Sequence, residues 1–191
     1  MTGIILFRAQ PFHNGHLEQI KRAFREMRDL DEDLYVIVGS ADKFGTKRNP
    51  IPIDVRMDLI TGTLEEELEE WSYEQRQHLK VVPLDDLSDE ANNTHSWGHY
   101  LYDSLCEITD DNEFVFYYSD KPEIVLSWFP DFRRDDIWFR FLSRVDDICA
   151  TDVRKCLSNL TKANCALLGE YLPFYVFTKI HELHEYIVNA R

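Results

Sequence analysis

Two histidines and an arginine lie close together near the amino terminus, in the stretch Phe7–His16 that reads FRAQPFHNGH. Arg8 carries a permanent positive charge. His13 and His16 are three residues apart, which is close enough for both rings to reach one ligand at the start of a helix. Gly15 leaves room for a close approach between backbone and ligand. Because free backbone N–H groups at the beginning of a helix favour anions, this stretch indicates a phosphate-binding site.

Two other interpretations of these histidines are open. A metal site would need a third ligand, and the stretch supplies only Arg8, which is never a metal ligand. Alternatively, the two histidines are unrelated polar residues at a helix start. The phosphate interpretation accounts for the arginine, the glycine and the histidines together, so we prefer it and expect no metal site among these residues.

An alternation of apolar strands and amphipathic helices must position this stretch. The periodicity predicts strands at residues 3–8, 34–39, 78–84, 113–118 and 136–142. It predicts helices at residues 16–29, 54–71, 95–107, after Pro122, and at 151–159 and 173–190. This order predicts an α/β fold with a doubly wound, Rossmann-like parallel sheet. Ligands of such sheets bind beyond the carboxyl ends of the strands, which is where FRAQPFHNGH falls.

Length and composition favour one globular domain. The 191 residues, 44% of them hydrophobic, can bury a sizeable core. We expect a single domain over residues 1–191, with an α/β core at 1–160 and a C-terminal helical extension at 161–191. That extension would pack on the core or make a subunit contact. A homo-oligomer is also expected.

The net charge and the cysteines of the chain limit which kinds of partner and which cellular location we expect. The formal net charge of −14 argues against a nucleic-acid partner, because phosphate backbones require excess cation. No apolar stretch approaches the roughly 20 residues of a membrane span, so no membrane partner is expected. The four cysteines show no CxxC spacing, which favours reduced thiols and a cytoplasmic location.

The segment RAQPFHNGH resembles the GRFQPFHxGH segment of the nucleotidylyltransferase superfamily, whose HxGH signature marks ATP-dependent adenylyl and cytidylyl transfer. Its longer form resembles the archaeal-type nicotinamide-nucleotide adenylyltransferases in particular. Phe7 and Ala9 depart from the glycine and phenylalanine that the family usually has. The resemblance implies an HxGH nucleotidyltransferase fold in which His13 and His16 act on the phosphates of ATP. It also implies that the ATP-binding residues include Arg8, Gln10, Phe12 and Gly15.

The segment ICATDVR at 148–154 is similar to the second signature of the superfamily, S/G-x-T-x-x-R. Thr151 is expected to cap a helix and Arg154 to lie on its first turn. By resemblance, Thr151 and Arg154 would bind the β- and γ-phosphates of ATP, and Arg154 would join the two histidines in catalysis. An ordinary capped helix with a surface arginine is the alternative. Cys149 stands where the family usually has serine.

Residues 39–56 are similar to a G-S-A…T-x-x-N-P-F stretch that ends in E-R in the same adenylyltransferases. By resemblance, the acceptor-binding residues are Gly39, Ser40, Thr46, Asn49 and Arg56. The lysines of this loop suggest a mobile cationic lid over phosphates, with a solvated loop as the alternative. Trp97 is the nearest counterpart of a tryptophan that stacks on the nicotinamide ring; a core tryptophan is the other interpretation. Ser119 follows the fourth strand, where the family often binds adenine and its ribose.

The resemblance implies an adenylyltransferase of NAD biosynthesis. It would join nicotinamide or nicotinate mononucleotide to the AMP moiety of ATP and release pyrophosphate, with Mg²⁺ arriving on ATP. Two alternatives are open. The same fold could use another acceptor, such as phosphopantetheine, FMN, or a sugar or glycerol phosphate with CTP. The chain could also be a nucleotide sensor without turnover.

Overall fold

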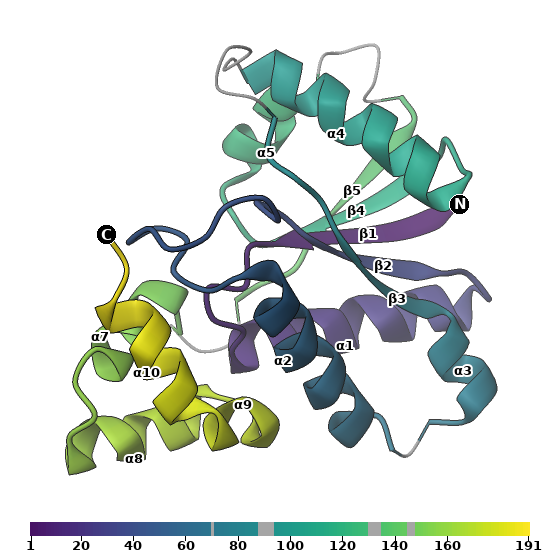
Figure 1. Ribbon diagram of the computed structural model, residues 1–191. Helices are drawn as coiled ribbons and strands as arrows, with labels where there is room; N and C mark the ends of the chain where they lie inside the picture. The colour runs from purple at the N-terminus through teal and green to yellow at the C-terminus, as the bar shows by residue number, and fades with distance from the viewer. Residues whose placement is uncertain (70, 88–93, 130–134, 145–147) are drawn as a thin grey trace.

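Five parallel strands form one sheet through the centre of the molecule, as the computed structural model shows (Figure 1). The structure describes residues 1–69, 71–87, 94–129, 135–144 and 148–191. The strand order is β3-β2-β1-β4-β5, so the chain moves outward from β1 in both directions. This order confirms the doubly wound, Rossmann-like sheet. The strands are β1 (Thr2–Phe7), β2 (Leu34–Val38), β3 (Leu79–Pro83), β4 (Phe114–Tyr118) and β5 (Ile137–Phe141).

Helices cover both faces of the sheet (Figure 1). The helices of the described residues are α1 (Asn14–Asp29), α2 (Ile53–Glu67), α3 (Tyr73–Gln77), α4 (Thr94–Thr109), α5 (Pro122–Trp128), α7 (Ala150–Leu157), α8 (Lys162–Tyr171), α9 (Phe174–Thr178) and α10 (Ile180–Val188). Helices α4 and α5 lie on one face. Helices α1 and α2 lie on the other, together with the C-terminal helices. None of the helices described is both long enough and apolar enough to cross a membrane.

Two hydrophobic clusters, one on each face, explain why the strands are apolar at nearly every position. Successive side chains of a strand point to opposite faces. Ile5 and Val36 accordingly pack with α1 and α2, whereas Ile4 and Ile37 pack with α4 and α5. β2 is buried at all five positions. A strand that is buried on both faces reads as a continuous apolar run, which is typical of parallel sheets.

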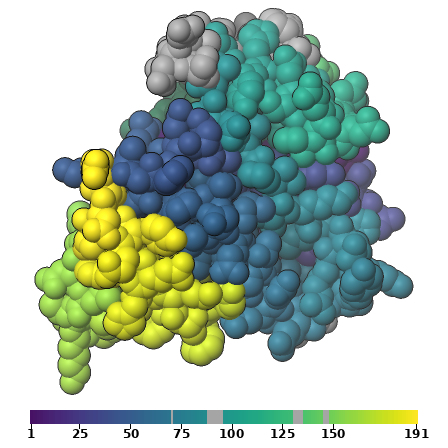
Figure 2. Space-filling view, in the orientation of Figure 1, coloured from purple at the N-terminus to yellow at the C-terminus, as the bar shows by residue number. Residues whose placement is uncertain are grey.

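The C-terminal helices share the cluster that contains α1 and α2. Leu168, Leu172, Val176 and Leu183 are almost completely buried there. Figure 2 shows these helices, in green and yellow, against the blue segment that includes α2. Helices α8, α9 and α10 therefore pack on the sheet domain.

Several helix boundaries differ from those expected. Helix α1 begins at Asn14, two residues before the predicted start, and the predicted helix at 173–190 is divided into α9 and α10. Helix α3 was not predicted. A capping box begins it, in which the Oγ of Ser72 accepts from the N–H of Gln75 and the Oε1 of Gln75 accepts from the N–H of Ser72. Helix α8 adds a further helix at the start of the tail.

Candidate functional site

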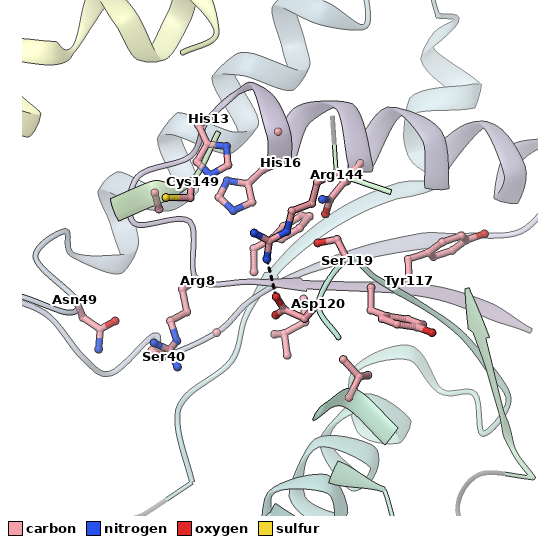
Figure 3. A pocket seen from close by; sticks show the side chains of 18 of the residues that line it. Arg8, His13, His16, Ser40, Asn49, Tyr117, Ser119, Asp120, Arg144 and Cys149 are labelled. Carbon is pink, nitrogen blue, oxygen red and sulfur yellow. Dashed lines mark hydrogen bonds and ion pairs between the residues drawn. The ribbon is translucent and has the colours of Figure 1, made fainter. Parts of the chain in front are cut away.

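A cavity of about 1140 Å³ opens beyond the carboxyl ends of β1, β2 and β4 (Figure 3). It lies at the centre of the sheet, where the connection from β1 leads to β2 on one side while β4 lies on the other. Open α/β sheets bind their ligands at such a switch point. Its polar and charged lining residues are Arg8, His13, His16, Gln19, Ser40, Lys43, Arg48, Asn49, Asp86, Tyr117, Tyr118, Ser119, Asp120, Arg144 and Cys149.

The rings of His13 and His16 stack on each other at the start of α1 (Figure 3). Their centroids are 3.7 Å apart and their planes differ by 24°. A Cβ atom at Gly15 would lie 3.1 Å from two atoms of the His13 ring, so the glycine also provides space for that ring. Phe12 is fully buried and also stacks on His16, with centroids 5.6 Å apart and an interplanar angle of 14°. Phe12, predicted to bind ATP, therefore supports a histidine.

Both histidines are neutral at pH 7. Burial lowers the pKa of His13 to about 4, and the positive charge of Arg144 acts in the same direction. Burial also lowers the pKa of His16 well below its usual range, followed by the effects of His13 and Arg144. Within the described chain, the Nδ1 atoms of both rings are buried and make no hydrogen bond. The pair can act as neutral hydrogen-bonding groups, and a general-acid role at neutral pH does not fit.

Among the described residues, four cationic side chains reach the cavity from different parts of the chain. They come from the end of β1 (Arg8), the loop after β2 (Lys43 and Arg48) and the segment after β5 (Arg144). Two carboxylates, Asp86 and Asp120, also line it, so the lining residues that the structure describes carry a net charge of +2 in a chain of net charge −14. Burial lowers the pKa of Arg8, and the nearby positive charge of Arg48 lowers it further. Cations held this close together favour an anionic ligand.

Arg144 and Asp120 were not singled out from the sequence. The Nη2 of Arg144 donates to the Oδ1 of Asp120 at 2.7 Å, so the ion pair joins the segments that follow β5 and β4 (Figure 3). A signal was available in both cases, because each residue lies just beyond the carboxyl end of a predicted strand. Ser119, which was predicted, lines the cavity beside Asp120.

Gln10 and Arg56 do not line the cavity; both hold its backbone in place. The amide of Gln10 is paired with the backbone of Ile51 through two hydrogen bonds of 3.0 and 2.9 Å. Arg56 is fully buried, and its Nη1 donates to the carbonyls of Arg8 and Gly39 at 2.8 Å each. Its Nη2 donates to the carbonyl of Ser40 at 2.8 Å. These bonds join the ends of β1 and β2, so Arg56 is a positioning residue.

The other residues expected to bind the acceptor divide into two groups. Gly39, Ser40 and Asn49 line the cavity, and the Oγ of Ser40 donates to Asp86 at 2.8 Å. Thr46 is exposed outside the lining, where its Oγ1 accepts from the N–H of Asn49 at 3.1 Å. Its role in the structure is to shape the loop.

Trp97 lines the cavity as well and belongs to an aromatic wall. Its ring meets that of Trp128 edge to face, with centroids 6.5 Å apart and an interplanar angle of 86°. Trp128 and Phe116 line the same cavity and contact each other in the same manner. Flat aromatic ligands suit such a wall.

The second signature lies beside the cavity and braces the first. The N-cap of α7 is Cys149, and Thr151 falls inside the first turn, so the predicted cap at Thr151 is wrong. Arg154 donates to the carbonyl of Gln10 at 2.6 Å and to the Oγ1 of Thr151 at 3.2 Å. Thr151 and Arg154 line a smaller cavity of about 240 Å³, and Cys149 lines the large one.

Comparison with known proteins agrees with this geometry. The family model described as cytidylyltransferase-like matches residues 8–155, a range that includes both signatures. The chain belongs to the cytidylyltransferase-like family. This family member is 30% identical over 125 residues to the nicotinamide-nucleotide adenylyltransferase of Haloarcula marismortui, an alignment that covers 65% of the chain and 55% of that relative. It is 31% identical over 100 residues to the enzyme of the same name from Thermococcus kodakarensis, covering 52% of the chain and 46% of the relative.

The chain spans only about a third to about half of the length of the curated relatives it matches. Among solved structures, it is similar to a bifunctional NMN adenylyltransferase/ADP ribose pyrophosphatase from Francisella tularensis. The TM-score is 0.70 at 17% identity, and the match covers 98% of the chain and 53% of that protein. The nicotinic acid mononucleotide adenylyltransferase of Plasmodium falciparum, solved with NaAD, gives a TM-score of 0.55 at 13% identity, with full coverage of both chains. At these low identities, the similarity to the two solved structures shows that this cytidylyltransferase-like chain shares their fold, and no more.

Proposed function

We propose that this chain is an adenylyltransferase that joins nicotinamide or nicotinate mononucleotide to the AMP moiety of ATP and releases pyrophosphate. The observation that carries the proposal is the meeting of the stacked histidines with Arg8, Arg48 and Arg144 at the switch point of the sheet. The names of its archaeal relatives support the choice of reaction.

In the proposed reaction, a phosphate oxygen of the mononucleotide attacks the α-phosphorus of ATP. A new P–O bond forms, the bond from the α-phosphorus to the αβ-bridging oxygen breaks, and that oxygen leaves with pyrophosphate. The second pKa of a phosphate monoester is near ~6, so the attacking group is largely a dianion at neutral pH and needs no general base. The protein's task is to align two anions and stabilise the charge on the departing oxygens.

The side chains of the cavity fit that task. His16 would donate to the α-phosphate in the transition state, and His13 would bind the neighbouring phosphates; neutral imidazoles can do both. Arg8, Arg48 and Arg144 would neutralise the triphosphate, and Arg154 would bind pyrophosphate once contacts to its own chain rearrange. Ser119 would lie near the adenosine, with Gly39, Ser40, Asn49 and the aromatic wall around Trp97 near the acceptor.

We propose that Mg²⁺ enters with ATP, bound mainly by its phosphates and by water. Among the described residues, no three side chains of the types His, Cys, Asp and Glu are grouped as metal ligands. Asp86 and Asp120 line the cavity, but each already accepts a hydrogen bond, from Ser40 and Arg144 respectively. These two carboxylates therefore give little reason to propose a metal ion that stays bound to the protein between reactions. A related structure from Francisella tularensis contains AMP and a manganese ion.

A pyrophosphate-release screen tests the proposal. ATP and CTP would each be combined with nicotinamide mononucleotide, nicotinate mononucleotide, FMN and phosphopantetheine, with Mg²⁺ present. We expect turnover with ATP and a pyridine mononucleotide. Turnover with another acceptor would identify a different transferase of the family. If no combination of nucleotide and acceptor releases pyrophosphate while ATP still binds, the chain is a nucleotide sensor.

We also propose that the protein works in the cytoplasm, where its four free cysteines would stay reduced. A homo-oligomer is part of the same proposal. Sedimentation of the full chain measures its assembly state directly.

A further inference from the structure

The end of the chain is hydrogen-bonded to the loop that carries two of the cavity's cations. This loop, residues 42–48 (DKFGTKR), will be called the cationic loop. The N–H of Arg191 donates to the carbonyl of Gly45 at 3.0 Å, and the N–H of Lys47 donates to the carbonyl of Arg191 at 3.2 Å. Residue 191 thus pairs with the loop in the manner of a short strand. Figure 2 shows the yellow end of the chain in contact with the blue segment.

At its tip the cationic loop has turn hydrogen bonds of its own but no buried side chain. The N–H of Thr46 donates to the carbonyl of Asn49 at 3.2 Å, and the N–H of Asn49 donates to the Oγ1 of Thr46 at 3.1 Å. Residues 44–48 are exposed, and the Phe44 side chain is 65% exposed. Gly45 has a φ of +72°, in the region that favours glycine, and a Cβ atom there would meet nothing within 4 Å. An exposed segment without buried side chains is held mainly by its backbone hydrogen bonds. The pairing with Arg191 therefore matters for where the tip lies.

The segment that precedes Arg191 is anchored in the body of the protein through α10. Helix α10 buries Ile180 and Leu183 in the main cluster. The Nδ1 of His184 lies 2.7 Å from the carbonyl oxygen of Leu157, the last residue of α7. Ile187 and Ala190 then line the smaller cavity together with Lys47 and Arg154. The chain end consequently links α7, which carries the second signature, to the cationic loop.

We infer that the backbone of Arg191 is a positioning element that holds the cationic loop in place for phosphate binding. Lys43 and Arg48 of this loop line the large cavity, so the position of the loop decides where these two charges lie. The residues matched by the family model end at 155, well before this contact. The expected effect of the loop position on ATP binding rests on the proposed adenylyltransferase function. The effect of the Arg191 hydrogen bonds on the position of the loop does not depend on that function.

The substitution Arg191→Pro tests the inference because proline has no N–H and so cannot donate to Gly45. Arg191→Ala is the matched control, since it removes the side chain and keeps the N–H. Limited trypsin digestion would follow cleavage after Lys43, Lys47 and Arg48. We expect Arg191→Pro to speed this cleavage by about 3- to 10-fold, the effect of losing one net hydrogen bond, with Arg191→Ala close to the wild type.

Kinetics give the second readout. In the pyrophosphate assay we expect Arg191→Pro to raise the KM for ATP by about 3- to 10-fold with kcat within about twofold, and Arg191→Ala to change neither. Thermal unfolding should give the same Tm for all three proteins. If trypsin digests Arg191→Pro and Arg191→Ala at the same rate, whether fast or slow, the backbone N–H of Arg191 does not hold the loop and the inference is wrong. A wild-type chain without turnover would count against the proposed function alone, because the digestion needs no reaction.

Discussion

His13 and His16 owe their chemistry to burial and to each other. Two imidazole rings with centroids 3.7 Å apart cannot both be protonated without strong repulsion, and burial already disfavours the charged form of each. They are therefore neutral donors beside permanent cations. Arg8 and Arg144 supply the charge, while the histidines supply directed hydrogen bonds.

At this scale the first prediction concerns His16. His16→Ala should lower kcat by roughly 10²–10³, the usual cost of removing one transition-state hydrogen-bond donor. Steady-state pyrophosphate release measures the effect. The control is His181→Ala, because His181 is exposed on α10, outside the lining of the cavity. A His16→Ala enzyme with unchanged kcat and normal folding would remove the central claim of the proposed mechanism.

A second residue-scale prediction is a loss of stability in mild acid. Because the pKa of His13 is near 4 in the folded chain and about 6.5 in the unfolded chain, the unfolded state binds more protons between these values. The free energy of unfolding should therefore fall as pH drops from about 6.5 towards 4, by roughly 3 kcal/mol from His13 alone. His16 acts in the same direction.

Urea unfolding at pH 7 and pH 5 measures this dependence. Replacing both histidines by glutamine should flatten it, since glutamine does not titrate. Most carboxylates titrate below pH 5, so they contribute little in this window. An equally steep dependence in the doubly substituted chain would contradict the assignment.

Among the elements, helices α4 and α5 set the aromatic wall of the cavity through one close contact. A Cβ atom at Gly98 of α4 would lie 1.6 Å from the carbonyl oxygen of Trp128 at the end of α5. Because the obstructing atom belongs to the backbone, the side chain cannot rotate away and the two helices must separate. The contact between Trp97 and Trp128 depends on this approach.

Gly98→Ala should therefore destabilise the chain by about 1–3 kcal/mol, the usual cost of overpacking. The gain in helix propensity, up to about 1 kcal/mol, offsets only part of it. Gly169→Ala in α8 is the matched control: its Cβ would meet only the Phe177 ring, at 3.8 Å, so it should be neutral or slightly stabilising. Thermal or urea unfolding compares the two. If both variants unfold alike, the helices do not approach as described.

For the whole molecule, the charge distribution separates the site from the rest of the surface. The chain carries a formal net charge of −14, yet the described residues that line the cavity include two more positive than negative side chains. A long polyanion would meet repulsion over much of the surface, whereas a small phosphorylated ligand needs only the local cluster. The global charge and the local site thus agree with the proposed nucleotide substrates.

The sequence by itself determined the order of the five strands along the chain and the location of the site. Apolar runs alternating with helical periodicity can be satisfied by a parallel sheet, and a loop that follows the first strand of such a sheet must open at its ligand-binding edge. The sequence alone therefore placed Arg8, His13 and His16 at the edge of the sheet where the cavity lies.

Only the tertiary structure decided where each polar side chain points. Gln10 and Arg56 match the family's pattern, yet the side chains of both form hydrogen bonds with backbone groups and not with the cavity. The reason is that the turns that end β1 and β2 leave buried N–H and C=O groups that need partners. Arg144 enters the cavity because β5 pairs with β4. Arg191 reaches the cationic loop because α10 packs against α7. Pairings between distant segments depend on three-dimensional packing, which local periodicity does not record.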